Sequence, residues 1–292
     1  RTRLLGYELL LRMEEARAAL DELSVLEQIR DRVKVRVESG EAPRYEAIKA
    51  EAEFISARQR QQVAKLAVEQ SRIAINQMAA GMLPGAWTLS ADLNDTPVWA
   101  STPPDRLADT LQNNPEIRAL NAEMQSSEAR IRQAKASVLP GVELRYNSGK
   151  DPDNRQDVFG AVVQIPLLDQ KQGPRQEATA EFLRAKARLE GRRSELKLQL
   201  DAAWMTLEMA NLRVEALSKG AIRDAEAALQ VAQAAYRFGE RGILDVLDAQ
   251  RVLRNVRADL LAARYQKHAA AIEIELLTGK QAYPSAKKTT TE

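Results

Sequence analysis

The residues of this sequence best suited to interact with ions are two carboxylates, Asp245 and Asp248. They stand three positions apart, so a helix would present both on one face. Neighbouring carboxylates raise each other's pKa and attract cations. Acidic residues in the first turn of a helix also complement the helix dipole, and this structural role is the alternative interpretation of the pair.

Other kinds of chemistry lack the residues they need. The chain has no cysteine and a single histidine, His268, so a disulfide framework or a Cys/His metal site within one chain is excluded. No nucleophile-base set and no phosphate-binding loop is present, and His268 is most simply a surface or inter-helix residue. The net charge is only +2, with acidic and basic residues interleaved, which does not favour nucleic acid as a partner. We expect no enzyme, no cofactor and no resident metal.

The acidic pair lies at the end of the second of two similar segments, 39–48 and 238–247, which are 199 residues apart; Asp245 is inside it and Asp248 directly follows it. Each segment joins two helical patterns through a Gly-Glu turn with a helix breaker. The second pattern of each copy ends about 40 residues later, at Gly81 or Gly279. The composition, 45% apolar but only 4% aromatic, is typical of long helices and coiled coils. Each copy therefore predicts a helical hairpin with a tight tip.

The second copy has the longer helices. Residues 175–238 keep a helical pattern that is interrupted only by Gly191 and Gly220, which predicts a rod. From Val246 to Leu277 the apolar positions alternate at three and four residues, the pattern of a coiled-coil seam, and its alanines allow close helix approach.

The segment between the two copies contains a helix start and the strand signal. Asn114, Pro115 and Glu116 supply a cap, a proline at the first helical position and a favourable charge. After that helix, residues 142–147 alternate between apolar and polar, and residues 158–165 form a second strand beyond a polar loop. Each run is long enough to cross a bilayer as a barrel strand. A soluble hairpin that caps a helical bundle is the alternative.

The order of these elements resembles the TolC-type outer-membrane efflux proteins. The resemblance covers essentially the whole chain and is most specific at 114–140, 236–239 and 245–250. Residues 166–173 are similar to the heavy-metal efflux branch in particular. The implied fold class is mainly α with a small β part: long antiparallel hairpins form a helical barrel, and a β-hairpin contributes to a trimeric outer-membrane β-barrel.

The resemblance implies a division of the chain into six parts. They are a first helical hairpin of the periplasmic tunnel (1–81), an equatorial connector (82–113), a helix toward the membrane (114–139), an outer-membrane β-hairpin (140–168), a second, longer helical hairpin (169–280) and a C-terminal tail (281–292). Because the chain begins without Met inside a helical pattern, we expect any signal peptide, lipidation site and first strand pair to precede Arg1.

The function implied by the resemblance is that of a passive exit duct in a tripartite efflux system. The protein would be a homotrimer in the outer membrane of a Gram-negative bacterium, in contact with outer-membrane lipid. Its partners would be a periplasmic adaptor and an inner-membrane pump of the resistance-nodulation-division type. In the strands, Val142, Leu144 and Tyr146 would then face lipid.

The resemblance also assigns roles to residues at the tips. Asp245 and Asp248 match the acidic gate, where three copies would surround a narrow opening, and Lys49 in the first copy would partly neutralise that ring. The closed-state links would be formed by Glu46, Tyr236, Arg241 and Arg264. Adaptor docking would use Gly40, Glu41, Ala42, Gly239, Glu240 and Gly242. Solvated charges without partners are the alternative for the links, and plain helix stops are the alternative for the glycines.

Two other classes of protein stay open at this stage. A periplasmic adaptor also contains long helical hairpins, but it needs flanking lipoyl and barrel domains that this sequence lacks. A soluble coiled-coil scaffold accounts for the heptads but not for an alternating strand pair between helices.

Overall fold

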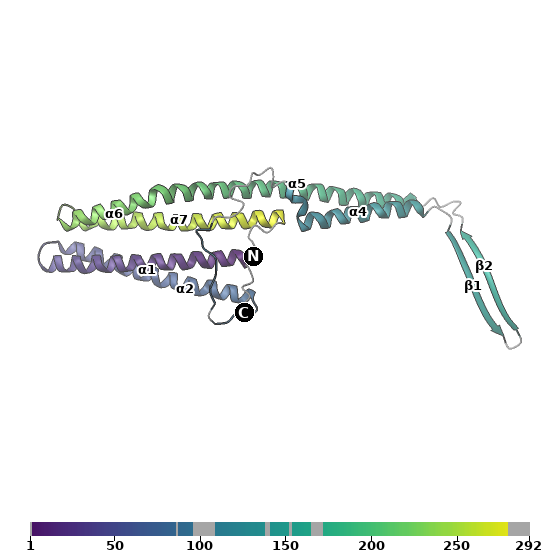
Figure 1. Ribbon diagram of the computed structural model, residues 1–292, viewed down its shortest axis with the longest axis horizontal. Coiled ribbons are helices and arrows are strands. Elements are labelled where there is room, and N and C mark those ends of the chain that lie inside the picture. Colours follow the sequence, from purple (N-terminus) through teal and green to yellow (C-terminus); the bar gives the residue numbers. More distant parts are fainter. Residues whose placement is uncertain are drawn as a thin grey trace, which may run out of the picture. The chain divides into compact units, whose positions relative to one another are not determined.

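A computed structural model describes residues 2–85, 87–95, 109–137, 141–151, 154–164 and 172–279 (Figure 1). The chain divides into two compact units, one made of Arg1–Leu107 with Leu200–Glu292 and the other of Ala108–Gln199. The predicted tail, 281–292, lies outside the described residues. Among the described residues, no helix has the length and apolar content of a membrane span.

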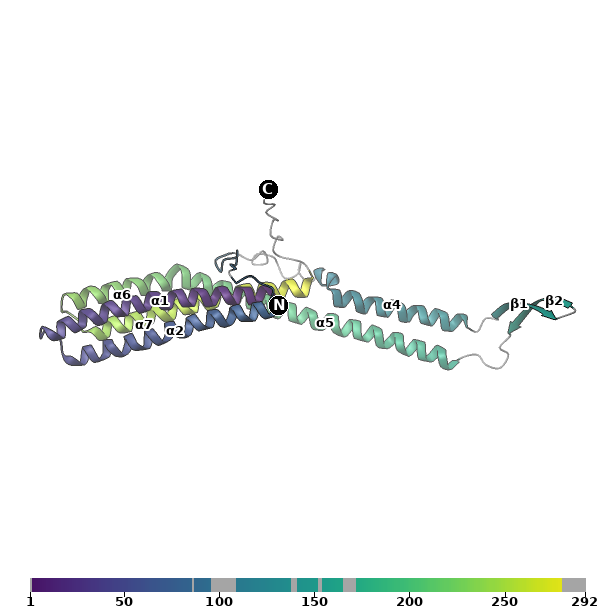
Figure 2. The ribbon, with the colours of Figure 1, turned by 90° about the horizontal axis from the view of Figure 1, so that it is seen from below.

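The first unit is a bundle of two helical hairpins. Its elements are α1 (Thr2–Glu38), α2 (Arg44–Met78), the last part of α5 (Gln172–Ala216), a π-helical segment (Leu217–Ala221), α6 (Ile222–Arg237) and α7 (Ile243–Thr278). Figures 1 and 2 show the α1–α2 hairpin alongside the α6–α7 hairpin. One core joins them near the tips, formed by Leu26, Ile29, Val33, Ala50, Ala57, Ala225, Leu229, Tyr236, Ile243, Val246, Leu247 and Leu253. Ala50 and Ala57 are fully buried, as close helix approach requires.

The predicted coiled-coil seam of α7 is mostly buried, and its first part lies in this core. Val246, Leu253, Leu260 and Ile274 are buried. Its polar member, Lys267, is half-buried, and burial lowers the pKa of its ammonium group. Helix α7 is buried on more than one stripe because it packs against α1 and α2 as well as α6.

The rod predicted over 175–238 is helical throughout. Helix α5 runs into the π-helical segment, which runs directly into α6. Gly191 lies inside α5, whereas Gly220 lies in the π-helical segment, where the wider turn inserts one extra residue into the helical ladder.

The second unit contains α4 (Pro115–Ala136), a strand pair and the first part of α5. A short 3₁₀ helix, Asp109–Asn113, leads into α4. The side chain of Asn114 accepts hydrogen bonds from the backbone N–H groups of Glu116, at 2.8 Å, and Ile117, at 3.4 Å. The predicted helix start is therefore confirmed, with Asn114 as the cap.

Strands β1 (Gly141–Asp151) and β2 (Asn154–Gln164) form an antiparallel hairpin. The pairing continues to Asp151 opposite Asn154, so the polar loop predicted over 148–156 is wrong. Backbone hydrogen bonding across the ladder does not depend on apolar side chains, and it extends the strands through polar residues that carry no strand signal.

One face of this hairpin is apolar. Val142 is opposite Val163, Leu144 is opposite Ala161 and Tyr146 is opposite Phe159, so these six side chains share a face. The Tyr146 and Phe159 rings lie 4.6 Å apart between centroids. On the other face the guanidinium of Arg145 pairs with Glu143 at 2.9 Å. The alternation predicted for β1 is confirmed.

Candidate functional site at the hairpin tips

The two hairpin tips have the same backbone structure. The N–H of Glu41 donates to the carbonyl of Arg36 at 2.8 Å, and the N–H of Glu240 donates to that of Ala235 at 2.9 Å. Gly40 and Gly239 have φ values of 82° and 75°, a left-handed conformation that strains any residue with a Cβ. The repeat seen in the sequence is thus repeated in the chain path of each tip.

A hydrogen bond joins the second hairpin to the first. The hydroxyl of Tyr236 donates to Oε2 of Glu46 at 3.1 Å, and Tyr236 is only 8% exposed. Burial is the main cause that raises the pKa of the Tyr236 hydroxyl, and the Glu46 charge raises it further. Gly242 also lies against Glu46, because a Cβ placed on it would be 3.5 Å from Oε1. Two of the residues predicted as closed-state links therefore meet.

Arg36 is a third member of this contact, and sequence analysis missed it. Its Nη1 donates to the carbonyl oxygen of Tyr236 at 3.0 Å, and its guanidinium lies 4.6 Å from the centroid of the Tyr236 ring. Its Nε is also 3.6 Å from Oε2 of Glu41. The sequence contains a signal for this role, because the residue that matches Arg36 in the second copy is Ala235. A change from arginine to alanine is a large difference inside an otherwise similar repeat.

The other two predicted link residues have different neighbours. Arg241, in the turn before α7, pairs with Asp245 in the first turn of α7 at 3.3 Å, and both side chains are exposed. Arg264 lies about 31 Å along α7 from its first residue, at 1.5 Å per residue. It acts on the connector instead, where its charge helps to lower the pKa of Asp92 after two larger effects from hydrogen bonds with Asn94.

The acidic pair lies on the outer side of the first two turns of α7. Asp245 and Asp248 are exposed, whereas Val246 and Leu247 between them are buried. Each carboxylate has an arginine beside it, because Nη1 of Arg251 is 3.5 Å from Asp248. Within the part of the chain that the structure describes, no three His, Cys, Asp or Glu side chains gather as a metal site would require.

Within the chain, Lys49 lies beside an aromatic ring. Its ammonium lies 5.9 Å from the ring centroid of Tyr45, its neighbour on the exposed side of α2. Arg241 and Arg251 are the cations beside the two carboxylates within one chain, and the partial neutralisation of a ring by Lys49 stays a prediction.

A groove of about 560 Å³ opens between α1 and α6 beside the tips. Its apolar lining includes Val35 and Phe238, and Phe238 is among the most exposed side chains of this unit. Glu41 and Gly239, two of the predicted docking residues, also line it. Gly40, Ala42, Glu240 and Gly242 lie in the two turns next to it.

His268 was predicted to be either a surface residue or an inter-helix residue. It is fully buried, so the inter-helix prediction is correct. Its ring stacks on Tyr7 of α1 with centroids 4.1 Å apart. Its Nε2 is 3.2 Å from the carbonyl oxygen of Leu93, which can only accept a hydrogen bond, so Nε2 is the donor. Burial lowers the pKa of this imidazole, which favours its neutral form.

Solved outer-membrane channel structures share this fold. The structure resembles that of the outer-membrane channel MtrE from Neisseria gonorrhoeae, with a TM-score of 0.78 and 19% identity over 96% of this chain and 65% of that one. It also resembles a structure of CusC, with a TM-score of 0.80 and 19% identity over 96% of this chain and 67% of that one. These likenesses show the fold.

The outer membrane efflux protein family matches residues 107–280, and the chain belongs to this family. The resemblance to TolC-type proteins is thereby confirmed. The cobalt-zinc-cadmium resistance protein CzcC from Cupriavidus metallidurans is 24% identical over 247 residues, which are 84% of this chain and 59% of CzcC. The chain therefore spans about three fifths of the length of this relative.

Proposed function

We propose that this chain forms part of the wall of a homotrimeric exit duct in the outer membrane. The duct passively conducts substrate to the outside from an inner-membrane pump of the resistance-nodulation-division type and its periplasmic adaptor. It catalyses no reaction, because energy and selectivity reside in the pump. The observation that carries the proposal is the apolar face of β1–β2, taken together with membership of the outer membrane efflux protein family.

This apolar face fits a lipid-facing surface. Leu144 is 83% exposed and Phe159 is 81% exposed, which is unfavourable in water but suits the outer surface of a membrane barrel. The aromatic pair Tyr146 and Phe159 ends the apolar band, since Ser148 and Asp157 follow on the same face. Aromatic residues commonly border the lipid-facing band of such barrels.

Exposed apolar stripes on the helices support assembly with other copies. On α2, Ile48, Ile55, Leu66 and Ile73 are exposed at helical spacing, and on α5 Leu198, Met205 and Leu212 are exposed at intervals of seven residues. Such heptad stripes are seams for neighbouring helices. A trimeric helical tunnel in the periplasm would cover them.

At the tips, we assign a latch to Tyr236 and Glu46, with Arg36 as an added member. Exposed and half-buried contacts of this kind contribute little each, about 0.2–1 kcal/mol, so adaptor binding can release them. The groove between α1 and α6, with its apolar lining and adjoining glycines, is the proposed docking surface for the adaptor. Asp245 and Asp248 are the proposed gate, with Arg241 and Arg251 moderating its charge.

The relative CzcC suggests a cargo. CzcC is a cobalt-zinc-cadmium resistance protein, and we propose divalent metal cations as the substrate class of the duct to which this chain contributes. Acidic side chains at a constriction would favour such cations.

The mass of the full chain in dodecyl maltoside, measured by light scattering with the detergent contribution subtracted, tests the assembly. We expect a trimer that conducts ions in a planar bilayer. A monomer or dimer that needs no detergent to stay in solution would contradict the duct and favour a coiled-coil scaffold.

A further inference from the structure

Helices α4 and α5 are joined by ion pairs along their facing sides. Each pair has an arginine on one helix and a glutamate on the other: Arg192 with Glu116 at 2.8 Å, Arg188 with Glu123 at 3.3 Å, and Arg130 with Glu181 at 3.0 Å. Along the direction of α4 toward the strands, these are successive contacts between the two helices. Each of the three cations therefore has a carboxylate opposite it.

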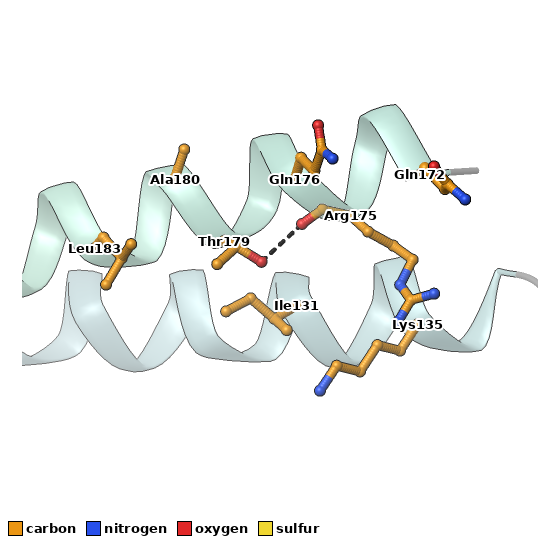
Figure 3. A pocket seen from close by; sticks show the side chains of 8 residues that line it. All are labelled: Ile131, Lys135, Gln172, Arg175, Gln176, Thr179, Ala180 and Leu183. Carbon is orange, nitrogen blue, oxygen red and sulfur yellow. Dashed lines mark hydrogen bonds between the residues drawn. The ribbon is translucent and has the colours of Figure 1, made fainter. Parts of the chain in front are cut away.

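The contact nearest the strands breaks this rule. A groove of about 510 Å³ lies there between the last turns of α4 and the first turns of α5 (Figure 3). Two cationic side chains, Lys135 of α4 and Arg175 of α5, line it, and no acidic side chain is among the lining residues. Figure 3 shows Arg175 reaching from α5 toward α4. Within the described ranges, no ion pair involves Lys135 or Arg175.

The remaining lining suits the phosphate of a larger ligand. Gln176 also lines the groove, although its side chain points away from α4 in Figure 3, and Thr179 already donates its hydroxyl to the carbonyl oxygen of Arg175 at 2.8 Å. The apolar side chain of Ile131 lies between the two helices, and low polarity near the cations strengthens their attraction for an anion.

Chain connectivity keeps this groove close to the strand pair. Helix α4 ends at Ala136 and β1 begins at Gly141, so the chain can separate them by at most about 17 Å. The sequence of the link from β2 to α5, 165–171, has one acidic and one basic residue and is neutral in sum. The positive charge of the groove is therefore not balanced by the net charge of this link.

We propose that this groove binds the phosphate of an anionic phospholipid in the membrane leaflet nearest the helices. Lys135 and Arg175 pair with the phosphate, which takes the place of the carboxylate found at the other contacts between the helices. The acyl chains extend toward the strand pair, whose apolar face faces the same lipid. This membrane setting rests on the proposed function, in which β1 and β2 lie in the outer membrane.

Short-chain lipids test the site without requiring a membrane. The full chain in dodecyl maltoside is titrated with dihexanoyl phosphatidylglycerol, dihexanoyl phosphatidylcholine or inorganic phosphate, and native mass spectrometry counts the bound molecules. We expect one phosphatidylglycerol per chain and much weaker binding of phosphatidylcholine. The K135Q/R175Q variant should bind phosphatidylglycerol roughly thirtyfold more weakly, since each of the two cations contributes about fivefold near an anionic lipid surface.

A matched control removes the same charge elsewhere. Arg58 and Lys65 are exposed on α2, and R58Q/K65Q should bind phosphatidylglycerol as the parent does. The K135R variant keeps the charge and should also bind as the parent does, which separates loss of charge from loss of structure. Equal binding of the two lipids, or an equal loss in both double variants, would overturn the proposal. Inorganic phosphate that competes as well as the lipid would overturn the choice of lipid.

These outcomes are independent of the test of the duct. A trimeric, conducting chain without selective phosphatidylglycerol binding would refute the lipid site alone. A monomer that binds phosphatidylglycerol selectively through Lys135 and Arg175 would refute the duct alone.

Discussion

Removing the hydroxyl of Tyr236 should loosen the contact between the two hairpin tips by about 1 kcal/mol. A hydrogen bond to a charged acceptor contributes roughly 1.5–3 kcal/mol when it is buried. Tyr236 is buried but Glu46 is only half-buried, so water compensates for part of that loss. Arg36 keeps its contacts with the Tyr236 carbonyl and ring position in the Y236F variant, so the loss should not exceed this value.

Hydrogen exchange followed by mass spectrometry measures this loosening locally. We expect peptides that cover 36–46 and 236–246 to exchange about fivefold faster in Y236F, the factor that corresponds to about 1 kcal/mol. Tyr265 is a matched control, because it is a half-buried tyrosine of α7 that lies away from the tips. The Y265F variant should leave tip exchange unchanged.

The same contact has a predicted pH dependence. Burial and Glu46 raise the pKa of Tyr236 above its ordinary value of 10.0, so the neutral hydroxyl is favoured in the folded protein. The resulting stability is fully present below pH 10 and is lost as the pH rises through the raised pKa. If Y236F exchanged no faster than Y265F at neutral pH, the latch would hold no energy and the tip assignment would be wrong.

Three further predictions concern the gate, the glycines and the buried histidine. The D245A/D248A variant should reduce block of the single-channel current by divalent cations by about tenfold, from loss of charge at the constriction; unchanged block would reject the acidic gate. G239A should lower the free energy of unfolding in urea by about 1 kcal/mol, because Gly239 has a positive φ. G191A should raise the free energy of unfolding by a similar amount, because Gly191 lies in a helix interior with open space around it. A change of the same sign in both variants would contradict the backbone argument. Burial lowers the pKa of His268 from 6.5, so the stability that the neutral imidazole contributes is retained above pH 6.5 and falls as the pH drops through the lowered pKa. The H268F variant should lose this part of the pH dependence of the free energy of unfolding, measured by urea titration at several pH values. An H268F variant with the parent's pH profile would contradict this role of His268.

The helical part of the fold was predictable because its signals are local. Gly40, Gly81, Gly239 and Gly279 end helices by adopting positive φ values. This conformation depends on the local backbone and needs no contact with distant residues. The heptad seam of α7 was predictable for the same reason. The full burial of His268 was not predictable, because it depends on Tyr7 and Leu93, which are far away in the sequence.

The strand ends were harder to predict than the strand pattern. Val142, Leu144 and Tyr146 alternate clearly, and the structure places them on one face. Residues beyond 148 are polar and include Gly149, so they resemble a loop in the sequence. Backbone pairing in the ladder, which no side-chain pattern reports, makes them strand.

At the tips, residue types were easier to predict than partners. Tyr236 and Glu46 meet as expected, but Arg241 has an acidic residue four positions further on, Asp245, and pairs with it. A pair within one turn requires little ordering of the chain, so it forms readily in place of a contact between hairpins. The difference between Arg36 and its match Ala235 marks the position in the sequence, but its contact with Tyr236 depends on how the two hairpins pack.

The most direct test of the central claim is the environment of β1 in a lipid bilayer. Because the chain has no cysteine, single cysteines at positions 142–147 can each be labelled with a fluorophore and quenched from lipid or from water. We predict a period of two, in which labels at Val142, Leu144 and Tyr146 are quenched by lipids with spin-labelled acyl chains and labels at Glu143, Arg145 and Asn147 by aqueous iodide. Quenching by iodide at all six positions would show that the strand pair does not lie in the membrane.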